Sequence, residues 1–125
     1  WSDNGKILIQ EDRSTFGDED FGGTSGEESS IWELDPESGK LTRVAQMDRD
    51  ALPEGQTDSE PDDLGNWESS GILDVSQLFD EAPGTRYIYG VQAHSLEDGI
   101  IAEAGLEQGG QLAFLTTETT SEMSL

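Results

Sequence analysis

The apolar residues of this chain fall in short runs, and acidic, glycine-rich segments separate these runs. No stretch keeps a helical period for long, whereas each run has the length of one strand and contains branched or aromatic side chains. We therefore expect an all-β fold, with at most one helical turn around residues 100–102. The expected strands are residues 6–10, 31–34, 40–45, 71–75, 86–91 and 111–115.

The clearest local signal is a hairpin turn with the sequence Asp35-Pro36-Glu37-Ser38-Gly39. Asp supplies a capping side chain, Pro a fixed φ and Gly a positive φ, and together they favour a tight reversal between two strands. By contrast, residues 11–30 and 48–66 carry seven acidic residues each and few branched apolar ones. Segments of this kind do not form buried elements, so we expect two long acidic loops.

The six expected strands form two groups of three, one on each side of the second acidic loop. This grouping fits stacked blades of a β-propeller better than a closed sandwich. We predict a partial propeller over residues 1–115, with about two blades near residues 5–47 and 67–115. Residues 116–125 are expected to form a disordered tail. A propeller needs at least about four blades, so the remaining blades or another copy of the chain would cover the open sheet faces.

The chain carries 28 acidic and six basic residues, which gives a net charge of −22. This excess disfavours any nucleic-acid partner. It suits either bound Ca²⁺, which takes carboxylate oxygens, or a high-salt environment that screens the repulsion, and composition leaves both readings open. Cysteine is absent and histidine occurs once, which excludes thiolate and multi-histidine metal sites within this chain. No apolar run is long enough to span a membrane.

Five segments carry a resemblance to a known family. They are Gly5 to Asp12 (GKILIQED), Ile31-Trp32 with Asp35-Pro36 and Gly39, Glu68 to Val75 (ESSGILDV), Val91 to His94 (VQAH) and Gly109 to Leu112 (GGQL). In this order they resemble the C-terminal part of secreted PhoX-like alkaline phosphatases and related phytase-like propellers. The resemblance covers most of the chain outside the two acidic loops.

The resemblance implies an extracellular or periplasmic enzyme that hydrolyses phosphate monoesters. Its calcium and iron ions (Ca²⁺ and Fe³⁺) would be held mainly by carboxylates at the propeller axis. By the same resemblance, Glu11, Glu68 and Asp12 are the expected metal ligands. His94, the single histidine, is a candidate residue for orienting the phosphate ester substrate. The residues themselves leave simpler alternatives open. Glu11 and Asp12 are also typical of solvated loop carboxylates, Glu68 is typical of an edge charge, and a lone histidine is often structural.

Two functions from different classes therefore remain. The first is part of a secreted, metal-dependent phosphomonoesterase. The alternative is a non-catalytic propeller module that forms part of an extracellular assembly, since about two blades would leave sheet faces uncovered.

Overall fold

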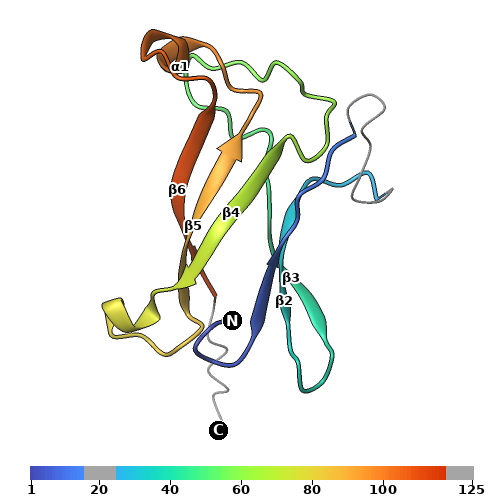
Figure 1. Ribbon diagram of the computed structural model, residues 1–125, viewed down its shortest axis with the longest axis vertical. Helices are drawn as coiled ribbons and strands as arrows, with labels where there is room; N and C mark the ends of the chain where they lie inside the picture. The colour runs from blue at the N-terminus through green and yellow to red at the C-terminus, as the bar shows by residue number, and fades with distance from the viewer. Residues whose placement is uncertain (16–24, 118–125) are drawn as a thin grey trace, which may run out of the picture.

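The computed structural model describes residues 1–15 and 25–117, and it contains two antiparallel three-stranded sheets (Figure 1). The first sheet has the order β1-β2-β3 and the second the order β4-β5-β6. The strands are Ile7–Gln10 (β1), Ser30–Leu34 (β2), Leu41–Gln46 (β3), Trp67–Asp74 (β4), Arg86–Ala93 (β5) and Gly109–Thr116 (β6). The expected all-β class and the grouping of the strands in threes are confirmed.

Among the described residues, helical structure is found in two short segments. A 3-10 helix, Ser76–Phe79, follows β4, and an α-helix, Gly99–Glu103 (α1), lies at the position expected for a helical turn. Within residues 1–15 and 25–117, no helix has the length and apolarity that a membrane span requires.

The predicted hairpin joins β2 to β3. Asp35 Oδ1 accepts the backbone N–H groups of Glu37 (2.9 Å) and Ser38 (3.4 Å), and Gly39 adopts a φ of 70°. Lys6 Nζ lies 2.8 Å from Asp35 Oδ2 and ties the residue before β1 to this turn. The bond from Lys6 and the backbone bonds hold the pKa of the Asp35 carboxyl well below its usual range.

β4 begins earlier than the apolar pattern predicts. The expected strand covered residues 71–75, whereas β4 starts at Trp67, which pairs with Ala93 of β5. Residues 67–70 (WESS) lack apolar alternation, but the backbone of β5 continues beside them and pairs with them. A bulge at Gly71, with a φ of 57°, separates this part from the predicted part. The partner strand, and not the local sequence, decides where β4 begins.

The second sheet also ends later than predicted. Thr116 is the last residue of β6, and Thr117 donates its backbone N–H to Thr85 O (2.9 Å). The first two residues of the tail predicted over residues 116–125 are therefore bonded to the second sheet and are not part of a tail. The rest of that predicted tail, residues 118–125, and residues 16–24 of the first acidic loop lie outside the described residues.

β1 and β4 are the neighbouring strands of the two sheets, and the sheets spread apart towards β3 and β6 (Figure 1). The buried core between and beside them is small. Ile31 and Tyr87 are fully buried, and Trp67, Ala93 and Leu96 form a cluster at one end of the second sheet. This thin core agrees with the composition, so polar contacts in the loops have to supply part of the stability.

The side chain of Arg49 holds the second acidic loop in place. Arg49 is largely buried, with 11% of its side chain exposed, and its guanidinium lies 5.3 Å from the centre of the Trp67 ring. Its polar partners are Asp58 Oδ2 (2.6 and 2.9 Å), Glu60 O (2.8 Å), Asp63 O (2.7 Å) and the carboxylate of Glu28 (3.3 and 3.4 Å). Because Glu28 precedes β2 and Trp67 opens β4, Arg49 connects the loop to both sheets.

Candidate functional site

A polar pocket lies where β1 ends and β4 begins. It has a volume of about 190 Å³ and is lined by Asp12, Arg13, Ser14, Asp63, Gly65, Asn66, Glu68 and His94. Asp12 follows β1 after one residue, Glu68 is the second residue of β4, and His94 comes directly after β5. The pocket therefore gathers side chains from the first sheet, the second sheet and the loop that joins them.

Glu68 contacts two other titratable side chains in this pocket. Its carboxyl interacts electrostatically with that of Asp12, and its Oε1 lies 3.4 Å from His94 Nε2. Burial raises the pKa of Glu68, the Asp12 carboxyl raises it further, and His94 opposes the shift. Neighbouring carboxylates repel each other, and a positive ion between them would relieve that repulsion. The pair is therefore suited to hold a cation.

His94 is oriented by a second contact. Its Nδ1 lies 2.7 Å from Gln108 Oε1, which can only accept a hydrogen bond. Nε2 is therefore the nitrogen that faces Glu68. This geometry presents one imidazole nitrogen to the pocket.

Asp63 and Asn66 form the wall of the pocket contributed by the loop. Asp63 is buried and accepts hydrogen bonds from Ser14 Oγ (3.0 Å) and Thr15 N (2.9 Å). The Asn66 amide donates through Nδ2 to Asp63 Oδ2 (3.2 Å) and to Glu60 Oε2 (3.0 Å). Within residues 1–15 and 25–117, the buried Asn66 Oδ1 has no hydrogen-bond donor. It is an additional oxygen that can accept a donor or a cation.

Arg13 brings positive charge to the pocket. Its side chain belongs to a residue that is only 4% exposed, and it donates through one nitrogen to Ser25 Oγ (2.7 Å) and Glu27 O (2.8 Å). Gly65 lies against it so closely that a Cβ at Gly65 would overlap the Arg13 carbonyl oxygen. The backbone of Arg13 is thereby held in place between the two segments.

Of the four residues predicted from the sequence, three meet at this pocket and one does not. Asp12, Glu68 and His94 line it, whereas Glu11 is not among the residues lining it. The Glu11 carboxylate instead accepts the backbone N–H of Ser30 (2.7 Å), and the Glu11 N–H donates to Ser30 O (3.0 Å). In this arrangement Glu11 closes the end of the β1-β2 ladder.

Sequence reasoning missed Arg13, Asp63 and Asn66. Asp63 is one of seven acidic residues in its loop, and nothing in the local pattern separates it from Asp62. Its partners Ser14 and Thr15 lie about fifty residues earlier in the chain, and this distance in sequence conceals their contact. The available signal was topological, because loops that leave the same end of two adjacent sheets converge there.

The donor set of the pocket fits part of a metal site. The carboxylates of Asp12 and Glu68 and the amide oxygen of Asn66 are hard ligands of the kind that Ca²⁺ prefers. Over residues 1–15 and 25–117, however, no group of three or more Asp, Glu or His side chains is arranged to hold a metal ion. Because Ca²⁺ takes about 6–8 oxygens, water or a substrate would have to supply the rest.

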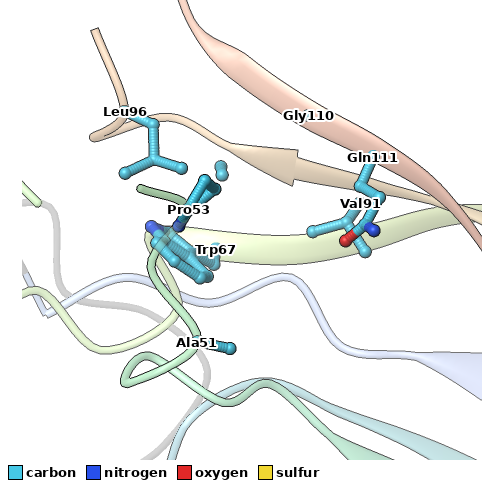
Figure 2. A pocket seen from close by; sticks show the side chains of 8 residues that line it. Ala51, Pro53, Trp67, Val91, Leu96, Gly110 and Gln111 are labelled. Atoms are coloured by element: carbon cyan, nitrogen blue, oxygen red, sulfur yellow. The ribbon is translucent and has the colours of Figure 1, made fainter. Parts of the chain in front are cut away.

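A second pocket lies nearby and differs in chemistry. Figure 2 shows Trp67, Leu96, Val91 and Gln111 around it, with Pro53 and Ala51 of the acidic loop alongside, and its volume is about 260 Å³. The Trp67 Nε1–H is already bonded to Ser95 Oγ (2.9 Å). Its lining residues include no titratable side chain. We therefore regard it as a gap in the core packing and not as a reactive site.

The chain was also compared with known proteins. Neither protein-family models, nor curated proteins, nor solved structures gave a match to it.

Proposed function

We propose that the two sheets are two neighbouring blades of a secreted β-propeller and that the polar pocket between β1 and β4 binds a metal ion and hydrolyses phosphate monoesters. The observation that carries the proposal is the meeting of Asp12, Glu68 and His94 around one pocket, although they come from three separate strand ends. The antiparallel order of both sheets, with β1 and β4 as neighbours, is the order that stacked blades require.

Metal binding is a requirement of this proposal. Asp12, Asp63 and Glu68 outnumber the single cation of the pocket, Arg13, so a phosphate dianion would be repelled without added positive charge. Asp12 and Glu68 would hold the ion, and Asn66 Oδ1 would add a neutral oxygen ligand. Ca²⁺ suits these ligands, and Fe³⁺ is also a hard cation with a preference for oxygen. Such an ion polarises the phosphoryl oxygens and lowers the pKa of a bound water.

The protein's own side chains would position the ester and manage a proton. His94 presents Nε2 to the pocket because Gln108 fixes Nδ1, so a proton at Nε2 can pass to the leaving oxygen of the ester. Arg13 would add attraction for the phosphate from a nearly buried position. Glu68 keeps the imidazole oriented through its contact with Nε2.

The test combines calorimetric Ca²⁺ titration at constant ionic strength with p-nitrophenyl phosphate hydrolysis before and after chelation. We expect Ca²⁺-dependent hydrolysis that is lost in Glu68→Gln and Asp12→Asn. The matched control is Glu103→Gln, since Glu103 lies in α1 and is exposed. Hydrolysis that survives both chelation and Glu68→Gln would refute the proposal, as would the absence of Ca²⁺ binding and hydrolysis in the unaltered chain.

A further inference from the structure

The side of β4 that carries Glu68 is the open side of the second sheet. Glu68 is opposite Gln92 of β5, whereas Tyr87 and Ala93, which point to the other side of β5, are buried. Two more rows follow the row of Glu68 on its own side of the sheet: Ser70, Gly90 and Leu112, then Leu73, Ile88 and Phe114. Glu68 therefore lies at one end of a surface that continues along β4, β5 and β6.

The two rows beyond Glu68 form an exposed apolar surface. None of their six residues is charged, although 27% of the residues in the chain are. Leu73, Leu112 and Phe114 are 67%, 72% and 53% exposed. Contiguous apolar surface of this kind marks contact sites on folded chains. We call Leu73, Ile88, Leu112 and Phe114 the apolar track.

A hollow of about 420 Å³ indents the apolar track. Its lining residues are Leu73, Ile88 and Leu112 of the track, together with Gly71, Ile72 and Tyr89. In the row between this hollow and Glu68, β4 and β5 place only Ser70 and Gly90. Since serine is small and glycine has no side chain, these two strands raise no large side chain between the polar pocket and the hollow.

The spacing along β5 sets the length of a molecule that reaches both places. Gln92 is opposite Glu68, and Ile88 lines the hollow. These two residues are four positions apart, which is roughly 13 Å at the rise of a strand. A phosphate group in the polar pocket is too small to span this length, whereas the alkyl chain of a phosphate monoester can follow the track.

We propose that the phosphate monoesters bound at this site carry an alkyl chain, with the phosphate in the polar pocket and the chain along the apolar track. The inference rests on the proposed function, because that function places the phosphate beside Glu68 and His94. Each methylene that the track removes from water should improve the affinity about fourfold. The net charge of −22 opposes the phosphate but not the chain, so the apolar contact adds affinity that charge does not cancel.

The experiment compares octylphosphonate with methylphosphonate in the presence of Ca²⁺. Both have a carbon–phosphorus bond that resists hydrolysis, so binding is measured apart from catalysis. His94 is the single histidine, and its imidazole therefore gives one NMR signal that reports on the polar pocket. We expect both phosphonates to shift this signal, and octylphosphonate to bind at least about tenfold more tightly than methylphosphonate.

Two variants of the apolar track test the path of the chain. Leu112→Asn and Leu73→Asn each place an amide on the track, so each should lower the preference for octylphosphonate to less than about threefold. The matched control is Ile100→Asn, at a residue of α1 that is 70% exposed, and it should keep the full preference. Circular dichroism of each variant has to match that of the unaltered chain, and either track variant suffices if the other does not fold.

The outcomes separate this inference from the proposed function. Equal affinities for the two phosphonates in the unaltered chain would leave phosphoryl binding in the polar pocket intact and show that the inference is wrong. It is also wrong if calorimetry detects octylphosphonate binding that leaves the His94 signal unmoved, or if the preference survives in the folded track variants. If neither phosphonate binds, the proposed function fails and the inference fails with it.

Discussion

Replacing Arg49 by Ala tests whether a buried cation holds the second acidic loop and both sheets together. The substitution removes every guanidinium contact in the loop and leaves the Asp58 carboxylate, whose side chain is 7% exposed, without its cation. It also leaves the carbonyl oxygens of Glu60 and Asp63 without this donor. Removal of one partner from a buried ion pair costs about 3–5 kcal/mol. That is a large part of the total stability of about 5–15 kcal/mol that is usual for a domain.

The assay is urea unfolding at fixed, high KCl, followed by tryptophan fluorescence, with Arg43→Ala as the matched control. Arg43 is exposed, pairs with Glu27 and stacks on Trp32, so its removal should cost about 1 kcal/mol. Arg49→Lys keeps the charge without the planar fork and should fall between the two. A loss for Arg49→Ala no larger than that for Arg43→Ala would refute the reasoning.

The same variant has a predicted pH dependence. Burial would raise the pKa of Asp58, but hydrogen bonds from Ser95 and Arg49 outweigh it and lower that pKa below the ordinary value. A lowered folded-state pKa gives stability above the unfolded pKa of about 3.9 and loses it as pH falls through the folded value. The difference in unfolding free energy between Arg49→Ala and the unaltered chain should therefore shrink below about pH 4. An undiminished difference in that range would mean that Asp58 is not the partner that matters.

Three further changes probe other parts of the fold. Ser76→Ala should lower the unfolding free energy by about 1–3 kcal/mol in urea titrations. The buried Ser76 Oγ donates to Asp74 (2.5 Å) and accepts two backbone N–H groups, and the variant loses all three bonds. A loss under about 0.5 kcal/mol would contradict the importance of these bonds. Asp74→Asn should reduce the loss of unfolding free energy in acid. Four hydrogen bonds to the Asp74 carboxylate outweigh burial and lower its pKa, so the stability that this carboxylate contributes is lost as pH falls through the lowered pKa. An acid unfolding transition that is unchanged in the variant would exclude this contribution from Asp74. Gly65→Ala should cost several-fold more than Gly105→Ala in thermal melts, because both have positive φ but only the Cβ at Gly65 overlaps a neighbour; equal losses would show that φ alone decides.

The strands that the sequence predicted best are those whose pattern is local. Branched apolar residues mark the runs at 6–10 and 86–91, and the turn at 35–39 carries its own Asp, Pro and Gly signals, so these elements need no knowledge of their partners. The extension of β4 back to Trp67 was missed because WESS has no strand pattern of its own. Its pairing with β5 supplies the reason for that extension.

The candidate site shows the same division. A resemblance indicated Asp12 and Glu68, the single histidine was a candidate in its own right, and the fold brings these three to one pocket. Nothing local indicated Asp63 or Asn66, because one acidic residue among seven in a loop has no distinguishing mark. The position of Asp63 depends on hydrogen bonds from Ser14 and Thr15, about fifty positions away, and Asn66 is held in turn by Asp63 and Glu60.

By itself, the sequence determined that this chain is all-β, strongly acidic and poor in core residues, because these properties follow from composition and from patterns a few residues long. The tertiary structure decided which carboxylates are paired, which are buried against Arg49 and which face water. Those distinctions arise only when loops from two sheets meet, since burial and charge proximity are properties of the folded chain. The register of the strands likewise fixes the side of the sheet on which each apolar residue lies.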